Sequence, residues 1–415
     1  MKKNINVLHL VSGDLSEGAA RGAYWFHQGL IKNGIQSKVL TNSKNIQEYD
    51  YVETNNKNIL DRLFKKIYSM LDALPSKFYL RRKKNIFSSG LVGIDITKHD
   101  LYEWADVINL HWVNDGFINI KYLKKINKPL VWTMRDMWPM TGGCHYALKC
   151  ERFKNGCGKC VQLDSNNELD ISSYIIKRKN KYVPKDTVLV GISNWISDQA
   201  RTSFLYKNHN IKTISNVINL DYFEVIKKEL AKKKLGLETQ KKIILCGAKS
   251  VDNFYKGFSK FIEAIKHMDT KKYFLCFFGN LDESSIDGLG FEYKKFGFIQ
   301  DKVILNNLYS SADVFVAPSL MEAFGKTITE AMASGTPTVC FDQTGPKDIV
   351  SHMVDGFLAK PFDSDDLAYG INWICSAKNY EQLCLNARNK VVEKFDSNVV
   401  SHQYIELYND LIKNK

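Results

Sequence analysis

The chain has 415 residues, which is enough for two or three domains that each bury a core of their own. Hydrophobic residues make up 44% and charged residues 25%, and the 8 prolines and 25 glycines exclude collagen-like, mucin-like and intrinsically disordered classes. Lysine and arginine outnumber aspartate and glutamate by 58 to 45, so the net charge is +13. This charge suits a nucleic acid, an anionic lipid or a phosphorylated substrate, but it suits plain solubility equally well.

The amino-terminal segment MKKNINVLHLVSG predicts a buried strand and not a signal peptide. Asn4, Asn6 and His9 interrupt its apolar stretch, and no small-residue cleavage site follows. The sequence has no run of about 18 apolar residues, so we expect no membrane span. We therefore expect a cytoplasmic protein, in which the nine cysteines are thiols or metal ligands and not a disulfide framework.

In the first half of the chain, short apolar runs alternate with segments of helical pattern. The runs are INVLHLV, QSKVLT, DVINLHW, PLVWTM and TVLVGIS, and a helical stretch from Ala19 to Asn33 separates the first two. Such runs are typical of parallel strands that are buried on both faces of a sheet. We therefore expect residues 1–218 to form a doubly wound α/β domain with a cysteine-rich insertion at residues 141–163.

The same alternation restarts after a lysine-rich linker and predicts a second doubly wound domain at residues 219–395. Its strands are KKIILCGA, YFLCFFG, DVFVAPS, TPTVCFD and DGFLAKP. The last segment, residues 396–415, has apolar side chains at helical spacing: Tyr404, Ile405, Tyr408 and Leu411. This stripe predicts an amphipathic helix, which we expect to return to the N-terminal domain.

The most informative segment is DVFVAPSLMEAFGKTITEAMASGTP. It predicts a strand that ends at Pro318, a loop that holds Glu322, and a helix that begins near Lys326. Free N–H groups at a helix start bind anions, and this one follows a parallel strand, where open α/β sheets bind ligands. Glu322 and Glu330 would flank the anion site, where carboxylates can accept hydrogen bonds from sugar hydroxyls. The segment therefore favours a phosphorylated sugar over two unrelated surface glutamates.

This segment resembles the Glu-x7-Glu motif of retaining GT-B glycosyltransferases, in particular glycosyltransferase family 4. The resemblance implies the GT-B fold, in which two doubly wound Rossmann-like domains face each other across a cleft. It also implies that Glu322 contacts the donor sugar and that Glu330 contacts the ribose of the nucleotide. The intervening donor-binding residues would be Phe324, Gly325 and Lys326. By the same resemblance, no catalytic metal is expected.

Other segments resemble the same family in order and spacing, so the resemblance covers nearly the whole chain. The turn GDLSEGAARGAYW implies that Gly18 lets the backbone approach the donor phosphates, and NLHW implies that His111 lies near the reacting centre. Taken alone, the same residues are explained by a tight turn and a structural histidine.

The segment GAKSVDNFYKGF resembles the one whose arginine and lysine neutralise the donor diphosphate. Lys256 matches the lysine, but Ala248 stands at the arginine position, which leaves Lys249 as the candidate replacement. Exposed lysines without a ligand are the alternative. The later segment GFIQD resembles the part that holds the base through the backbone around Phe298 and Ile299.

The segment TMRDMWPMTGGCHYALKCERFKNGCGKC resembles a subset of the family that acts in bacterial surface polysaccharide assembly. Members of this subset often carry histidine before Asp-Met-Trp, where this chain has Arg135. The resemblance therefore places Arg135 and Asp136 on the acceptor side, and the departure at Arg135 weakens an acceptor-base role there.

The same segment contains four cysteines within 17 residues, namely Cys144, Cys150, Cys157 and Cys160. Thiolates this close in sequence can surround a tetrahedral zinc ion, with His145 as a spare ligand. Free thiols and a labile disulfide are the alternatives. A structural zinc ion would stiffen an insertion that closes over the acceptor side.

The segment Arg62–Lys84 carries eight basic residues interleaved with aromatic side chains such as Phe64 and Tyr68. This pattern favours contact with an anionic membrane surface, which a lipid-linked acceptor would require, and a solvated helical face is the alternative. No RNA- or DNA-binding motif surrounds the segment, so we expect no nucleic acid partner.

Taken together, the resemblance predicts a retaining glycosyltransferase of the hexosyltransferase type. We expect it to move a sugar from a nucleotide diphosphate, UDP more often than GDP in this family, to a glycan or lipid-linked acceptor of O-antigen, capsule or exopolysaccharide. It would work in the cytoplasm, peripherally at the inner face of the membrane. The alternatives are a non-catalytic nucleotide-sugar-binding or scaffolding protein and a GT-B nucleotide-sugar epimerase, because Ala248 and Arg135 depart from the family pattern.

Overall fold

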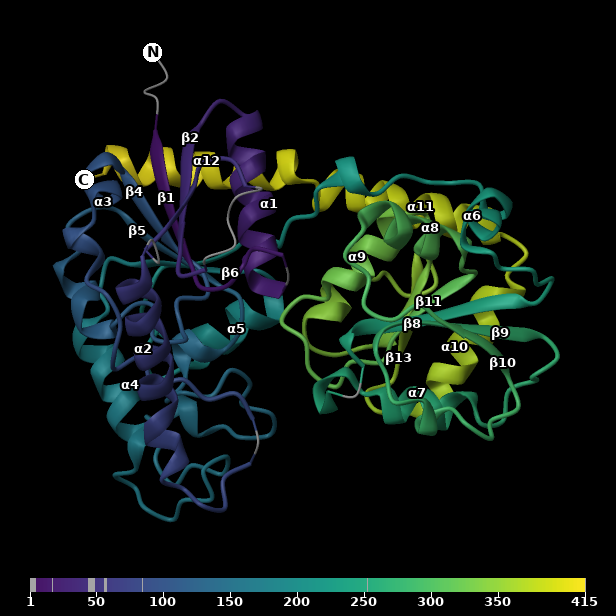
Figure 1. The fold of residues 1–415 in the computed structure, drawn as a ribbon, viewed down its shortest axis with the longest axis horizontal. Coiled ribbons are helices and arrows are strands. Elements are labelled where there is room, and N and C mark those ends of the chain that lie inside the picture. Colours follow the sequence, from purple (N-terminus) through teal and green to yellow (C-terminus); the bar gives the residue numbers. More distant parts are fainter. Residues whose placement is uncertain are drawn as a thin grey trace. The chain divides into compact units, whose positions relative to one another are not determined.

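The structure is a computed structural model that describes residues 5–16, 18–43, 49–55, 58–83, 85–251 and 253–414. The chain divides into two compact units (Figure 1). Unit 1 comprises Met1–Val217 and Ser397–Lys415, and unit 2 comprises Ile218–Asp396. Each junction lies one residue from the expected domain boundary. No helix in these described ranges is long and apolar enough to cross a membrane.

Unit 1 contains a parallel sheet that has seven strands within the described residues, in the order β3-β2-β1-β4-β5-β6-β7. The strands are β1 (Asn6–Val11), β2 (Gln36–Thr41), β3 (Val52–Thr54), β4 (Val107–Leu110), β5 (Leu130–Met134), β6 (Val188–Gly191) and β7 (Ile211–Thr213). All side chains of β4, β5 and β6 are buried, as expected for strands with helices on both faces. The strand order reverses between β1 and β4, and ligands bind at such a switch point in open α/β sheets.

The helices of unit 1 are α1 (Gly18–Lys32), α2 (Ile59–Lys77), α3 (Asp100–Trp104), α4 (Ile171–Tyr182), α5 (Asn194–Thr202) and α12 (Ser397–Lys413). Helices α2 to α5 each follow a residue whose side chain accepts from a free N–H group of the first turn. Asn58 and Asp61 form a capping box at the start of α2, and the Asp170 carboxylate accepts from two backbone N–H groups of α4. These polar residues therefore explain where α2 and α4 begin.

The C-terminal helix α12 belongs to unit 1, where it packs beside α1 (Figure 1). Tyr404 and Tyr408 are fully buried. Asn109 Nδ2 donates to Tyr408 Oη at 2.6 Å, and the Tyr404 ring lies 4.2 Å from that of Phe26. The contact is close, because a Cβ at Gly29 would lie 2.8 Å from the carbonyl oxygen of Ser397. The helix thus covers the sheet next to β4.

Unit 2 contains a second parallel sheet, with the order β10-β9-β8-β11-β12-β13. Its strands are β8 (Lys242–Ser250), β9 (Tyr273–Asn280), β10 (Glu292–Lys295), β11 (Val314–Ala317), β12 (Thr338–Phe341) and β13 (Gly356–Ala359). Its helices are α6 (Lys228–Leu235), α7 (Phe258–Ile265), α8 (Lys302–Ser311), α9 (Lys326–Ala333), α10 (Ser364–Ser376) and α11 (Tyr380–Lys394). The prediction of two doubly wound α/β domains is confirmed.

Three strands were not expected from the sequence: β3, β7 and β10. All three lie at sheet edges, and each has side chains that are partly or fully exposed. An edge strand does not need a continuous apolar run, because one side and part of its faces meet water. The apolar pattern therefore identified the buried strands and missed these edges.

Candidate functional site

The segment that holds Glu322 and Glu330 forms the strand, loop and helix that its pattern predicted. β11 leads into a loop that ends at Gly325, whose φ of 119° lies in the region that favours glycine, and α9 follows directly. Gly345 packs so closely on this loop that a Cβ there would lie 2.5 Å from its backbone. Gly345 N also donates to Glu322 O at 2.9 Å. These contacts hold Glu322 beside the N-terminus of α9.

Glu330 lies on α9 and is buried, with 3% of its surface exposed. Tyr309 Oη donates to its Oε2 at 3.0 Å, and Lys326 Nζ lies 3.7 Å from Oε1. Oε1 has no hydrogen-bond partner among the described residues. A buried carboxylate oxygen without a hydrogen-bond donor lowers the stability of the fold unless a ligand supplies one. Glu330 can therefore accept a hydrogen bond from a hydroxyl group of a bound molecule.

Lys256 and Glu322 form an ion pair that the sequence analysis did not anticipate. Lys256 ends a 3-10 turn (Phe254–Lys256), and Gly257 follows with a φ of 64°. A Cβ at Gly257 would lie 2.0 Å from Pro318 O, so the turn lies directly on the end of β11. This close approach brings Lys256, which is 66 residues away in sequence, into contact with Glu322.

A small cavity of about 20 Å³ opens next to this pair, between the ends of β8 and β11 and the first turn of α9. Its walls include Lys256, Ser319 and Thr327, and backbone of the Gly247–Ala248 segment. The structure thus brings Lys256 and Glu322 together near the start of α9 at the carboxyl end of the unit 2 strands, and Glu330 lies further along the same helix. That arrangement suits a phosphorylated ligand with hydroxyl groups.

The other residues of unit 2 that were predicted to bind the nucleotide-sugar donor differ in how exposed they are. Lys249 is exposed near the end of β8, and Ala248, at the expected arginine position, is buried. Phe298 is 41% exposed and Ile299 is half-buried in the loop between β10 and α8, so both can meet a ligand. Phe324 is buried, with its ring edge-on against Phe395, and its predicted contact with the donor stays a prediction.

In unit 1, Gly18 begins α1 with a φ of 50°, and outside its own neighbourhood in the chain no atom of the described residues lies within 4 Å of the position its Cβ would take. The open space at this helix start leaves room for a ligand to approach the backbone. The predicted phosphate contact at Gly18 stays a prediction.

His111 lies directly after β4, but its ring is buried and contacts other side chains of unit 1. Arg135 donates to His111 Nδ1 at 3.3 Å, so the ring proton is assigned to Nε2, which bonds His9 Nδ1 at 3.0 Å. Burial, the positive charge of Arg135 and the neighbouring His9 together hold the pKa of His111 well below its usual value. His111 is therefore neutral, and both its nitrogens are engaged. Its predicted role at the reacting centre stays a prediction and requires the ring to turn.

Arg135 is buried beside His111 and donates to Asn216 Oδ1. Burial lowers the pKa of its guanidinium to about 10, which still leaves it charged at neutral pH. In this position Arg135 connects the ends of β4 and β5 to Asn216, near the end of the first stretch of unit 1.

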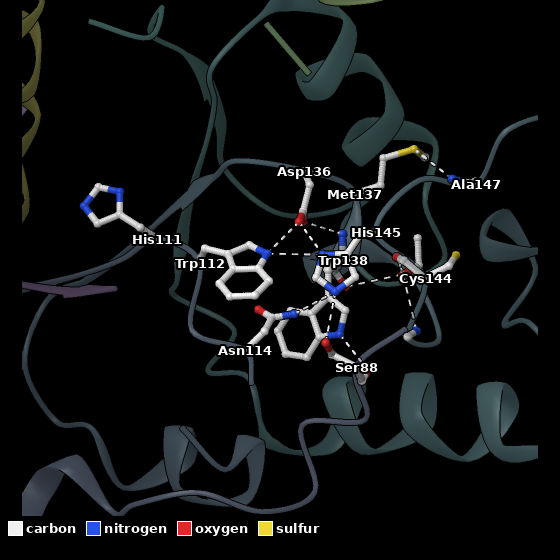
Figure 2. A network of polar contacts seen from close by, with 12 residues as sticks. Ser88, His111, Trp112, Asn114, Asp136, Met137, Trp138, Cys144, His145 and Ala147 are labelled. Atoms are coloured by element: carbon white, nitrogen blue, oxygen red, sulfur yellow. Dashed lines mark hydrogen bonds and ion pairs between the residues drawn. The ribbon is translucent and has the colours of Figure 1, made fainter. Parts of the chain in front are cut away.

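Asp136 lies at the centre of a polar network that Figure 2 shows from close by. Its Oδ2 bonds His145 Nδ1 at 2.6 Å and accepts from Trp112 Nε1 at 3.0 Å. On the other side of the imidazole, Nε2 bonds Ser88 Oγ at 3.0 Å and lies 3.3 Å from Asn114 Nδ2. The side chain of His111 points away from this network (Figure 2).

The sequence pattern predicts Asp136 as a site residue but does not indicate Ser88, Trp112 and Asn114 as its neighbours. A signal existed for the last two, because they follow His111 in HWVN directly after a buried strand. Polar residues at the carboxyl end of a parallel strand lie at the ligand edge of the sheet. No local pattern connects Ser88 to this position.

The four cysteines of the insertion line one cavity of about 20 Å³, and all four are thiols. Burial raises the pKa of the Cys144 and Cys160 thiols and brings that of Cys157 to about 12. In the described part of the chain, no three Cys, His, Asp or Glu side chains are arranged around a metal position. His145, the expected spare ligand, is held by Asp136 and Ser88 instead. The zinc site stays a prediction, and the thiols would have to turn toward one another to bind the ion.

Comparison with known proteins agrees with this architecture. Residues 227–391, which form most of unit 2, match the family model described as glycosyl transferases group 1. The chain is 24% identical over 395 residues to the uncharacterized glycosyltransferase MJ1607 of Methanocaldococcus jannaschii, covering 92% of this chain and 91% of the relative. It is also 30% identical over 220 residues, 50% of this chain and 56% of the relative, to N,N'-diacetylbacillosaminyl-diphospho-undecaprenol alpha-1,3-N-acetylgalactosaminyltransferase of Campylobacter jejuni.

Among solved structures, the chain resembles Alr3699/HepE of Anabaena, which was determined in complex with UDP-glucose. The TM-score is 0.64 at 17% identity, and the match covers 98% of this chain and all of that one. The two α/β units and these matches define a glycosyltransferase of the GT-B fold. Within that class, the Anabaena structure contains UDP-glucose, and the name of the Campylobacter jejuni relative specifies a sugar linked to diphospho-undecaprenol. The transferase interpretation is therefore favoured over the scaffolding and epimerase alternatives.

Proposed function

We propose that this glycosyltransferase moves a hexose-type sugar from a UDP-sugar to a glycan or lipid-linked acceptor during surface polysaccharide synthesis, with retention at the anomeric carbon. The observation that carries the proposal is the arrangement at the carboxyl end of β11. There, a buried carboxylate with an unsatisfied oxygen, Glu330, lies on the same helix whose N-terminus faces the Lys256–Glu322 pair.

In this scheme, Glu330 Oε1 accepts a hydrogen bond from the ribose hydroxyl of the nucleotide. Among the described residues this oxygen has no hydrogen-bond donor, and the Lys326 ammonium lies 3.7 Å away. The diphosphate lies at the N-terminus of α9 and draws the Lys256 ammonium away from Glu322. Glu322, released from the lysine, accepts hydroxyl groups of the sugar. The donor thus exchanges one ion pair of the free enzyme for two contacts of its own.

Transfer breaks the bond between the anomeric carbon and the diphosphate, so negative charge grows on the leaving phosphate. Lys256 and the N-terminus of α9 stabilise that charge as it develops. A metal ion has this role in other transferases. The acceptor hydroxyl attacks from the same face, and the departing phosphate takes its proton. No covalent intermediate is required in this scheme.

The acceptor side is assigned to unit 1, where Asp136 and Trp112 end the central strands. The Campylobacter jejuni relative is named for an acceptor carried on diphospho-undecaprenol. By analogy, we place this reaction at the inner face of the cytoplasmic membrane, with a polyprenyl-linked glycan as the acceptor.

The test begins with a thermal-shift panel of UDP-glucose, UDP-galactose, their N-acetyl forms and GDP-mannose, because a bound donor stabilises the fold by RT ln(1 + [L]/Kd). The stabilising donor is then incubated with lipid extract, and release of nucleoside diphosphate and the anomeric configuration of the product are measured. Stabilisation by none of these nucleotide sugars, or a product of inverted configuration, would contradict the proposal.

A further inference from the structure

The helix α2 in unit 1 has its polar side docked on the protein. Asp72 and Ser76 are buried, and Asp72 Oδ1 accepts from Ser89 Oγ at 2.8 Å and from Gly90 N at 2.6 Å. One turn earlier, Ser69 donates to the carboxylate of Asp115. The face of α2 that meets the rest of unit 1 is therefore held by hydrogen bonds.

This docking is close. A Cβ at Gly116 would lie 2.4 Å from the backbone of Tyr68, so α2 packs directly on the loop that follows β4. The capping box at Asn58 fixes the first turn of the helix. The orientation of α2 about its axis is thus determined by the contacts of residues 68–76 with the rest of unit 1.

The opposite face of α2 carries large apolar side chains in solvent. The side chains that are between 52% and 80% exposed are Ile59, Leu60, Leu63, Phe64 and Met70. The chain continues the surface after the helix with Phe78, 75% exposed, and Leu80, 96% exposed. In α1, by contrast, Trp25, Phe26 and Leu30 are buried. Contiguous exposed apolar side chains of this kind mark an interaction surface.

Basic residues flank the apolar ones on this surface. Within the described residues 58–83 they are Arg62, Lys65, Lys66, Lys77, Arg81, Arg82 and Lys83. The acidic residues of this range are Asp61, in the capping box, and the buried Asp72. Lys84, the last basic residue of the segment expected at the membrane, lies outside the described residues. The surface therefore has apolar side chains along the helix, basic side chains among them in its first two turns, and further basic residues at and beyond its end.

We propose that α2 and residues 78–83 form a membrane-binding surface, in which the helix lies in the plane of an anionic bilayer with its apolar face among the acyl chains. An apolar stripe with basic flanks is complementary to acyl chains beneath anionic headgroups. The choice of a lipid over a protein partner also rests on the proposed lipid-linked acceptor. The inference adds insertion of the apolar face to the electrostatic contact expected from the sequence.

The same contacts connect this surface to the Asp136 network. Ser89 and Gly90 hold Asp72 of α2, and their neighbour Ser88 bonds His145, the partner of Asp136. Ser88 O also accepts from Trp138 Nε1 at 2.8 Å. A helix bound at the membrane would therefore hold the acceptor side of unit 1 at a fixed place relative to the lipid surface.

The test is co-sedimentation of the full chain with phosphatidylglycerol or phosphatidylcholine vesicles at low and high salt. Leu63→Gln with Phe64→Gln removes exposed apolar area and should weaken binding at both salt concentrations by on the order of tenfold or more. Arg81→Ser, Arg82→Ser and Lys83→Ser together should weaken binding mainly at low salt, by roughly fivefold per charge. These side chains are largely exposed, so the fold is expected to tolerate both variants.

Matched controls carry the same kinds of substitution in unit 2, namely Leu385→Gln with Val392→Gln on α11 and Lys233→Ser with Lys234→Ser on α6. Both controls should bind vesicles as the wild type does. The inference would be overturned if the wild type failed to bind phosphatidylglycerol vesicles at low salt. It would also be overturned if the apolar variant and the basic variant both bound these vesicles as strongly as the wild type. If the wild type self-associates and the Leu63→Gln, Phe64→Gln variant is a monomer, the apolar face of α2 binds a second copy of the chain and the inference is wrong. Donor stabilisation is measured in the same samples, so a failure here is distinct from a failure of the proposed function.

Discussion

Because Lys256 pairs with Glu322, substitutions of Glu322 and Glu330 should change the affinity for UDP in different directions. Glu330→Gln keeps the shape of the side chain but removes the charge that would accept the ribose hydroxyl. A hydrogen bond to a charged group contributes about 1.5 to 3 kcal/mol and a neutral one about 0.5 to 1.5 kcal/mol, so the loss is about 1 to 1.5 kcal/mol. Binding of UDP and of the UDP-sugar should both weaken by about tenfold, because both ligands carry the ribose.

Glu322→Gln should act differently. It removes a contact with the sugar that is worth about tenfold in affinity. Because the same change also frees Lys256, the intact donor should bind about twofold to tenfold more weakly. It also releases Lys256, whose side chain is 32% exposed while that of Glu322 is 22% exposed. A partly exposed ion pair is worth about 0.2 to 1 kcal/mol, so UDP alone should bind unchanged or up to about fivefold tighter.

Isothermal titration calorimetry with UDP and with the stabilising UDP-sugar measures all four affinities. Glu292→Gln is the matched control, because Glu292 also pairs with a lysine of unit 2, Lys241, at 2.7 Å but lies on the edge strand β10. Both ligands should bind this control as they bind the wild type. Equal weakening of both ligands by Glu322→Gln and Glu330→Gln would refute the division of roles between the two carboxylates.

Three further predictions concern unit 1. Purified without chelator, the protein should contain about one zinc per chain, and Cys157→Ser should lower both zinc content and thermal stability. If the wild-type protein contains no metal, the cysteines are free thiols or form a disulfide. Asp136→Asn, which replaces the acceptor bonded to His145 and Trp112, should lower the rate of transfer by on the order of tenfold to a hundredfold and leave the affinity for UDP unchanged; weaker UDP binding would show a structural defect instead. Burial lowers the pKa of His27 to about 4, so the folded state disfavours the proton that the unfolded chain takes up near pH 6.5, and stability should fall as the pH drops from 6.5 toward 4. The part due to His27 is about 2 kcal/mol at pH 5 by urea denaturation, and a His27→Gln variant that keeps the full pH dependence would disprove this assignment.

The sequence by itself determined the two doubly wound domains and the place of the glutamate motif. Both depend on local patterns, because a buried parallel strand needs a continuous apolar run, and the start of α9 follows directly from a strand, a loop and Gly325. Edge strands such as β10 escaped the same reasoning, since their partly exposed side chains need no such run.

Only the tertiary structure decided which side chains of these patterns meet. Lys256 contacts Glu322 because Gly257 lies on the end of β11, and nothing near either residue in sequence encodes that contact. At the end of β4, His111 turns toward Arg135 while its neighbour Trp112 reaches Asp136, although the segment NLHW does not distinguish their directions. These choices depend on non-local packing.

The helix α2 shows the same limit most clearly. Its sequence mixes apolar, basic and small polar residues, and this pattern does not say which face of the helix docks on unit 1. The structure docks the face that holds Asp72 because Ser89 and Gly90, which come later in the chain, satisfy its carboxylate. A buried carboxylate must be hydrogen-bonded, so these distant partners decide that the apolar face remains in solvent.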